Sequence, residues 1–92
     1  MIRAFKSKET ASLFRLEPTR RWANIERAAL RKLIQLDLAS NINDLRVPPG
    51  NQLEALAGNR KGQWSIRIND QFRICFRWSF DGPEDVEIVD CH

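Results

Sequence analysis

Hydrophobic residues in the first part of the chain recur at the spacing of two helices. Ser7 can cap a first helix that is predicted to begin near Lys8 and to end before Pro18. A second helix is predicted to follow Thr19 as its N-cap, and its apolar positions are Trp22, Ile25, Ala29, Leu33 and Leu36. The short break at 17–18 favours pairing of the two helices as an antiparallel hairpin.

Alternation of hydrophobic and polar residues indicates strands in the remaining segments. Short strands are predicted at 2–5 and 53–56, and longer ones at 64–68, 72–78 and 86–91. Turn sequences separate the last three, which are therefore expected to pair consecutively and antiparallel. The order β-α-α-β-β-β predicts an α+β fold, with an antiparallel sheet packed against the N-terminal helical hairpin.

The same alternation places three arginines on one side of two neighbouring strands. Arg67 lies on the polar side of its strand, and Arg73 and Arg77 lie on the polar side of the next. Such a stripe can hold an RNA backbone, and a guanidinium can stabilise negative charge on a phosphate. The spacing also fits three solvated arginines on an open sheet face, so both interpretations stay open.

Charge is unevenly distributed along the chain. All fifteen Lys and Arg lie between Arg3 and Arg77 together with seven of the twelve acidic residues, a balance of +8, whereas the later residues carry −5. A basic body suits a phosphate-rich partner, because basic side chains release counterions from a polyanion. A solvated surface of mixed charge accounts for the balance as well.

Length and composition limit the class of protein. The 92 residues, 42% hydrophobic and 29% charged, suit a single globular domain over 1–92. No segment has the ~18 apolar residues of a membrane span and no secretory signal is recognisable, so a cytoplasmic protein without a membrane partner is expected. Two cysteines and one histidine do not provide the four ligands of a structural zinc, so neither a metal nor a cofactor is expected.

Ionisable residues at the end of the last predicted strand are candidates for chemistry. Asp90 and His92 share one face of that strand, and the Asp90 carboxylate favours an imidazolium that can serve as a general acid. Cys91 points to the other face, which argues against a nucleophilic pair of Cys91 and His92. A histidine without a catalytic role is the alternative. Glu54 is either a general base or an exposed glutamate, and composition does not decide between the two.

The segment LEALAGNRKGQWSIRINDQFRICF at 53–76 resembles the core motif of HigB-like toxins, also called plasmid-maintenance killer proteins, of the RelE/ParE superfamily. Residues 1–5, the loop at 48–51 and the closing VEIVDCH at 86–92 are similar to the family as well, most closely to its GraT-like branch. The resemblance covers essentially the whole chain. It implies a RelE-like fold and a metal-independent, ribosome-dependent endoribonuclease that cleaves translated mRNA by attack of a 2′-hydroxyl on the adjacent phosphate.

The resemblance also implies roles by position. Arg73 is the phosphate-stabilising arginine, Asp90 and His92 match the acidic and histidine members of the tail, and Glu54 is a further candidate for the catalytic group. Arg60 and Arg67 fall among the implied RNA contacts, and Lys61, Arg77 and Cys91 are further candidates for RNA binding. Two positions depart from the family pattern, because Glu54 stands where relatives have the histidine of L-H-P-L, and Cys91 where their tail reads D-Y-H. Since tyrosine can stack on a base and cysteine cannot, a weaker nuclease than a D-Y-H relative is predicted.

Partners are implied by the same resemblance. HigB-like toxins are neutralised by a HigA-type antitoxin with a helix-turn-helix domain, so contact with operator DNA is expected only indirectly, through the antitoxin. The ribosome and mRNA are the expected targets. Two alternatives remain: a ParE-like toxin that inhibits DNA gyrase without a nuclease site, and a degenerate toxin that survives as a binding or co-repressor module. Arg73 with Asp90 and His92 argues against the first, whereas Glu54 and Cys91 keep the second open.

Overall fold

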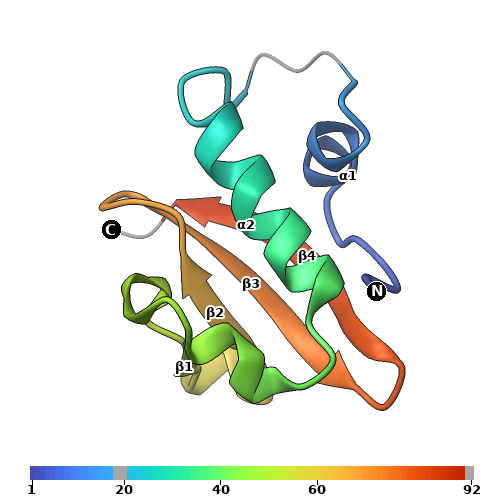
Figure 1. The fold of residues 1–92 in the computed structure, drawn as a ribbon, viewed down its shortest axis with the longest axis vertical. Helices are drawn as coiled ribbons and strands as arrows, with labels where there is room; N and C mark the ends of the chain where they lie inside the picture. Colours follow the sequence, from blue (N-terminus) through green and yellow to red (C-terminus); the bar gives the residue numbers. More distant parts are fainter. Residues whose placement is uncertain (18–20, 91–92) are drawn as a thin grey trace.

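The computed structural model describes residues 1–17 and 21–90, and a helix lies across one face of its antiparallel sheet (Figure 1). The helices are α1 (Lys8–Phe14) and α2 (Glu26–Leu38), and the 3₁₀ turns are η1 (Ile42–Arg46), η2 (Pro49–Asn51) and η3 (Gly58–Arg60). The strands are β1 (Glu54–Ala55), β2 (Trp64–Arg67), β3 (Phe72–Ser79) and β4 (Gly82–Asp90), in the spatial order β1-β2-β3-β4. The predicted α+β class with an antiparallel sheet is confirmed.

Helix α1 begins where the sequence predicts. The Ser7 hydroxyl accepts a hydrogen bond from the Thr10 backbone N–H at 3.2 Å, and the helix ends two residues before Leu16, which adopts a positive φ of 62°. The fully buried Thr10 hydroxyl in turn accepts the backbone N–H of Ile88 at 3.1 Å. Since β4 is the edge strand, α1 lies beside that edge as well as against α2.

Helix α2 begins later than predicted. It starts at Glu26, with Ile25 at the N-cap and no side-chain cap, and the predicted cap Thr19 lies outside the described residues. Trp22 and Ile25 are nevertheless buried, and the Ile25 N–H donates to the Trp22 carbonyl at 3.0 Å. The apolar spacing therefore correctly predicted that Trp22 is buried, but Trp22 lies in a turn and not in the predicted helix. Neither described helix is long and apolar enough to cross a bilayer.

The predicted first strand is reduced to a single bridge. Phe5 pairs with Val86 in parallel, and the neighbouring backbone bonds run from Arg3 N–H to Pro83 O at 2.7 Å and from Val86 N–H to Ala4 O at 3.1 Å. A register shift on β4, where Asp85 has a φ of 53°, interrupts longer pairing. The N-terminal segment thus covers the edge of β4 without forming a regular strand.

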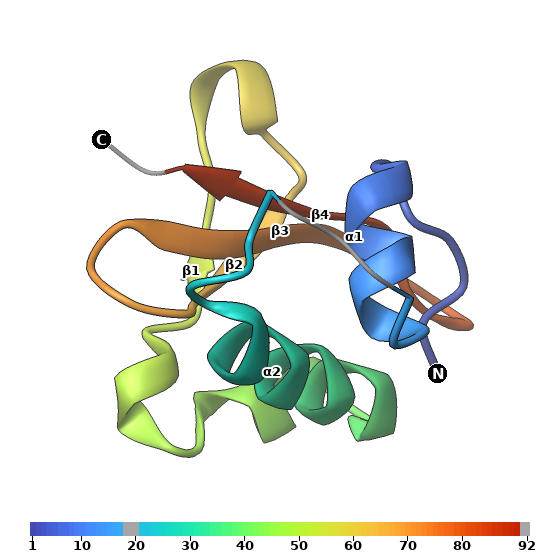
Figure 2. The ribbon, with the colours of Figure 1, turned by 90° about the horizontal axis from the view of Figure 1, so that it is seen from above.

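The hydrophobic core lies between α2 and the inner face of the sheet. The fully buried strand residues Ile66, Ile74 and Phe76 pack with Leu33 and Leu36 of α2 in one cluster. Burying each such side chain contributes on the order of 1.5–3 kcal/mol. Figure 2 shows α2 on one side of the sheet only, which leaves the opposite face for the polar side chains of the same strands.

A buried asparagine fixes the loop between η1 and β1. The Asn51 amide donates to the Leu45 carbonyl at 3.1 Å and to the Gln35 side-chain oxygen at 3.2 Å, and its oxygen accepts from the Lys32 ammonium. Burial, together with the neighbouring Arg31 charge, lowers the pKa of Lys32. Because Asn51 is held in this way, the next residue, Gln52, also has a defined position.

The bond between α1 and β4 predicts a measurable loss of stability. Replacing Thr10 by valine keeps the volume but removes the acceptor of the buried Ile88 N–H, so the free energy of unfolding should fall by about 1–3 kcal/mol. The Ile88 amide should exchange its hydrogen faster, whereas the Val86 amide, which donates to Ala4 O, serves as the control. An unfolding free energy within about 0.5 kcal/mol of wild type would contradict this role.

Candidate functional site

The face of the sheet opposite α2 carries rows of polar side chains. Residues paired across strands point to the same side, and the register aligns Glu54, Ser65, Cys75 and Glu87 in one row across all four strands. The next row consists of Arg67, Arg73 and Val89. The predicted alternation of β2 and β3 is confirmed, since Ile66, Ile74 and Phe76 face α2.

Arg73 is held on this face by two uncharged acceptors. Its Nε donates to the hydroxyl of the fully buried Ser65 at 2.9 Å, and its Nη2 donates to the carbonyl of Gln52 at 2.7 Å. Gln52 adopts a left-handed φ of 47°, which ends η2 and turns this carbonyl toward the sheet. Within 1–17 and 21–90, Arg73 has no carboxylate at ion-pairing distance, so its charge is fixed in place and available to an anion.

The other three arginines predicted to bind RNA are each paired with a carboxylate. Arg67 contacts Asp70 and donates its Nε to the Asn69 carbonyl at 3.2 Å. The Arg77 Nε lies 3.5 Å from Asp85, and Arg60 Nη1 lies 3.7 Å from Glu87. Arg67 and Arg77 of the predicted stripe are therefore ion-paired on this face, and Arg73 differs from both in having no counter-charge among the described residues.

A loop around η3 stands over the same face. Figure 2 shows this segment rising on the side of the sheet away from α2. Gly62 has a φ of 92°, and a Cβ there would lie 2.8 Å from Nη1 of Arg77, so a side chain at Gly62 would displace the arginine beneath the loop. The loop carries the exposed Lys61 and the half-buried Arg60, two of the predicted RNA contacts.

Glu54 and Asp90 lie on different faces. Glu54 is exposed on the edge strand and pairs with Ser65, the residue that holds Arg73, so Glu54 and Arg73 share a face. Asp90 pairs with Phe72 and accepts from the Gln71 side chain at 3.1 Å, on the side of the sheet that faces α2. The register thus places Asp90 and Arg73 in adjacent positions but with side chains on opposite faces.

The predicted group of Arg73, Asp90 and His92 is therefore not assembled by the described residues. Cys91 and His92 lie outside them. The chain leaves β4 beside Arg73, because Val89 pairs with Arg73 and Asp90 follows it. No three His, Cys, Asp or Glu side chains in the described part of the chain come together as a metal ion requires.

The two residues that orient Arg73 were not predicted from the sequence. Ser65 is opposite Cys75 in the register, and its place on the arginine side of the alternation was a usable signal, whereas its burial is seen only in the structure. Gln52 acts through its backbone carbonyl, and a left-handed glutamine leaves no recognisable pattern. Glu87, which lies 3.7 Å from Nη1 of Arg60, was also not predicted to contribute to this face.

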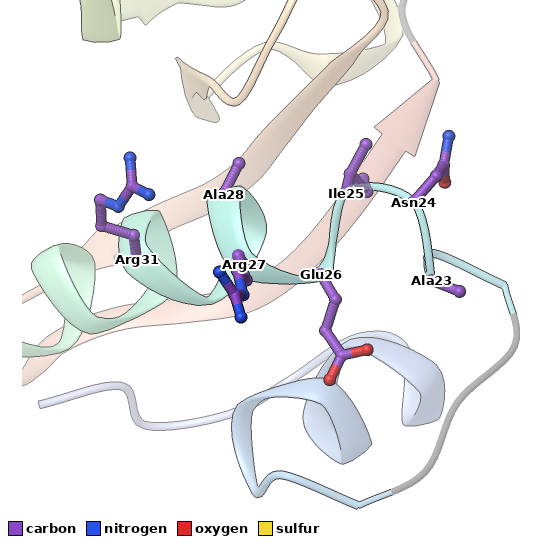
Figure 3. A pocket seen from close by; sticks show the side chains of 7 residues that line it. All are labelled: Ala23, Asn24, Ile25, Glu26, Arg27, Ala28 and Arg31. Carbon is purple, nitrogen blue, oxygen red and sulfur yellow. The ribbon is translucent and has the colours of Figure 1, made fainter.

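A shallow pocket lies elsewhere on the molecule, at the N-terminal end of α2. Figure 3 shows that the turn before the helix and its first two turns form it, with one carboxylate and two guanidinium groups among the side chains. Its lining residues are Ala23, Asn24, Ile25, Glu26, Arg27, Ala28 and Arg31. None of them belongs to the sheet, so the pocket is separate from the face that carries Arg73.

Relatives of known sequence or structure match this chain. Toxin HigB-1 of Vibrio cholerae is 54% identical over 56 residues, 61% of this chain and 59% of the relative. An uncharacterised protein of Haemophilus influenzae is 39% identical over 56 residues, 61% of this chain and 55% of the relative, so the match spans less than two thirds of either protein. The solved YoeB/ParE toxin from Agrobacterium tumefaciens is 21% identical with a TM-score of 0.51, covers 99% of this chain and 94% of its own, and is similar in fold.

A family model decides the assignment. The model described as the RelE-like toxin of type II toxin–antitoxin system HigB matches residues 3–92. The match includes the β2–β3 hairpin with Arg73 and the β4 strand that ends beside it. The expected RelE-like fold agrees with the solved relative. The chain therefore belongs to the HigB-like family of RelE-like toxins of type II toxin–antitoxin systems.

Proposed function

We propose that this toxin is a ribosome-dependent endoribonuclease that cleaves translated mRNA without a metal ion. The observation that carries the proposal is Arg73, a guanidinium held by Ser65 and Gln52 with its charge unpaired among the described residues. A fixed charge at the reacting phosphate stabilises the transition state more than a mobile one, because no reorganisation is required. The basic balance of the chain up to Arg77 supports an RNA substrate.

The reaction needs little from the protein beyond positioning and proton transfer. RNA supplies its own nucleophile, so the 2′-oxygen bonds to the adjacent phosphorus, the bond to the 5′-oxygen breaks, and a 2′,3′-cyclic phosphate and a 5′-hydroxyl result. Glu54, exposed on the Arg73 face, would accept the proton of the 2′-hydroxyl. His92 would supply a proton to the leaving 5′-oxygen from the tail that follows β4 beside Arg73, and the Asp90 carboxylate would favour its imidazolium form.

RNA contacts would come from the same face and its overhanging loop. Arg60 and Lys61 lie in or next to η3, while Arg67 and Arg77 flank Arg73 along β2 and β3. We assign Cys91 to this set by its position beside the tail histidine. A HigA-type antitoxin, the ribosome with its mRNA, and operator DNA reached through the antitoxin are the proposed partners of a cytoplasmic protein.

Purified ribosomes carrying an mRNA in the decoding site test the proposal. The toxin should cut this mRNA, leave 5′-hydroxyl ends, and fail on a matched mRNA with a 2′-O-methyl group at the cut position. The same mRNA without ribosomes should remain intact. Cleavage of the methylated mRNA would exclude attack by the 2′-hydroxyl, and absence of cleavage in every reaction would exclude the nuclease.

The cysteine at position 91 predicts a gain of activity. Replacing Cys91 by tyrosine supplies an aromatic face on which a base can stack, a contact worth about 1–3 kcal/mol, so cleavage on programmed ribosomes should become at least several-fold faster. Cys91→Ser is the matched control, because serine is similar in size and has no ring. A tyrosine variant no faster than the wild type would count against a reduced nuclease.

A further inference from the structure

Glu87 is an enclosed carboxylate on the proposed RNA-binding face. It lies on β4 opposite Cys75, its side chain is only 16% exposed, and its Oε2 is buried and accepts no hydrogen bond among the described residues. Two cations surround this oxygen, with Lys6 Nζ at 3.4 Å and Arg60 Nη1 at 3.7 Å. A carboxylate that is largely removed from water depends on such partners for its stability.

The two partners reach Glu87 from segments outside the four strands, and the backbone N–H of Lys6 donates to the Val86 carbonyl at 2.9 Å. Lys6 ends the N-terminal segment, and Arg60 belongs to η3, between β1 and β2 on the far side of the sheet from β4. The contact between Arg60 and Glu87 therefore spans the sheet. The residues of the row between them, Ser65 and Cys75, are buried although α2 covers only the other face.

Arg60 contacts its two side-chain partners in the described part of the chain through one nitrogen. Its Nη1 lies near Glu87 and donates to the Gln63 side-chain oxygen at 3.1 Å, while the side chain remains 38% exposed. A guanidinium has five N–H donors in a rigid plane, so fixing one nitrogen orients the others. The remaining donors of Arg60 are thus directed from a fixed point above the face that carries Arg73.

From this geometry we infer that Glu87 is a positioning residue, which ties η3 to the sheet and fixes Arg60 as a phosphate-binding group for RNA. The inference rests on the proposed function for its ligand. A simple count of charges predicts the opposite result. A carboxylate on an RNA-binding face repels phosphate, so its removal would tighten binding. The two accounts therefore predict opposite signs for the same substitution.

Binding of wild type and Glu87→Gln to ribosomes programmed with 2′-O-methyl mRNA separates the accounts. Glutamine should weaken binding by about 3- to 10-fold, the loss of one charge-assisted contact. The slope of log affinity against log salt should fall by about 0.7, as for one lost phosphate on a single strand. In a variant that already carries Arg60→Gln, adding Glu87→Gln should leave the affinity for programmed ribosomes unchanged. Equal or tighter binding by Glu87→Gln would overturn the inference.

Two further variants keep the result interpretable. Glu87→Asp retains the charge but shortens the reach, so it should also weaken binding, and it replaces the glutamine variant if that one does not fold. Glu9→Gln is the matched control, because it removes the ion pair with Arg21, also at 3.4 Å, from α1. Its affinity should equal that of the wild type.

A measurement without RNA separates this inference from the proposed function. Hydrogen exchange at the amides of Arg60, Lys61 and Gln63, which bond within the loop around η3, should accelerate in Glu87→Gln, while the amides of β3 stay protected. Unchanged exchange would refute positioning by Glu87 even if the wild type cleaves mRNA. A different combination is accelerated exchange in Glu87→Gln and a wild type that neither binds nor cleaves mRNA on programmed ribosomes. That combination would refute the proposed function and the RNA ligand, and only the structural contact between η3 and β4 would stand.

Discussion

Lysine in place of Arg73 should slow mRNA cleavage by about 100- to 1,000-fold, the loss that follows removal of one fixed donor to a transition-state anion. The guanidinium bonds Ser65 through Nε and the Gln52 carbonyl through Nη2 at the same time. An ammonium on a flexible stem keeps the charge but does not reproduce this planar pair of contacts. The measurement is the single-turnover rate of cleavage on programmed ribosomes.

The matched control for this substitution is Arg15→Lys, at an exposed position that follows α1 and lies outside the sheet. Its cleavage rate should stay within about 2-fold of the wild type, since surface substitutions away from special contacts have small effects. The unfolding free energy of Arg73→Lys should fall by no more than about 1–3 kcal/mol, as expected for two lost hydrogen bonds. A folded Arg73→Lys variant that cleaves at the wild-type rate would remove Arg73 from the reaction.

Alanine in place of Phe76 should lower the free energy of unfolding by about 3–5 kcal/mol, the largest stability effect expected here. Phe76 is fully buried on the α2 side of β3 and its ring packs edge-on against Trp78, with centroids 6.5 Å apart. A domain of this size has a stability of about 5–15 kcal/mol, so the loss is a large part of the total. Denaturation by urea, with the midpoint and slope both recorded, measures it.

Phe80 provides the control for Phe76, because it is the same residue type four positions later and its side chain is fully exposed. Phe80→Ala should change the free energy of unfolding by no more than about 0.5 kcal/mol. Equal losses for the two variants would contradict the burial of Phe76 in the core on the α2 side of β3. The pair therefore compares a core residue of β3 with an exposed residue of the turn that follows it.

Strand alternation was the most informative part of the sequence. It correctly predicted that Ile66, Ile74 and Phe76 face the helix and that Arg73 does not, because a strand in an antiparallel sheet with one covered face must keep period two. Helical spacing did not correctly predict where α2 begins. Trp22 is buried by a turn rather than by α2, since burial depends on packing and does not require a particular backbone conformation.

The residues that contact the arginines could not be predicted from the sequence. Asp85 and Glu87 meet Arg77 and Arg60 because of a register shift in β4 and a loop that crosses the sheet, and neither feature has a local pattern. The Gln52 carbonyl reaches Arg73 from 21 residues earlier in the chain. Contacts of this kind follow from tertiary packing, so their effect on the available charge emerges only in three dimensions.

The separation of Asp90 from Arg73 has a different origin. Alternation already placed Asp90 on the side of Val86 and Ile88, and Arg73 on the other, so the two faces follow from period two in both strands. The resemblance to HigB-like toxins nevertheless grouped them by role. The grouping therefore rests on the resemblance and on the tail at 91–92, which lies outside the described residues.

The most direct test of the central claim is a map of mRNA 5′ ends in cells that express the chain under tight control. A nuclease that acts through Arg73 should produce new 5′ ends in phase with codons inside translated regions, and the Arg73→Lys variant should not produce them. DNA damage without such ends would support a gyrase-directed toxin, and growth without either effect would support a binding or co-repressor module. Either of these outcomes would contradict a ribosome-dependent nuclease that acts through Arg73.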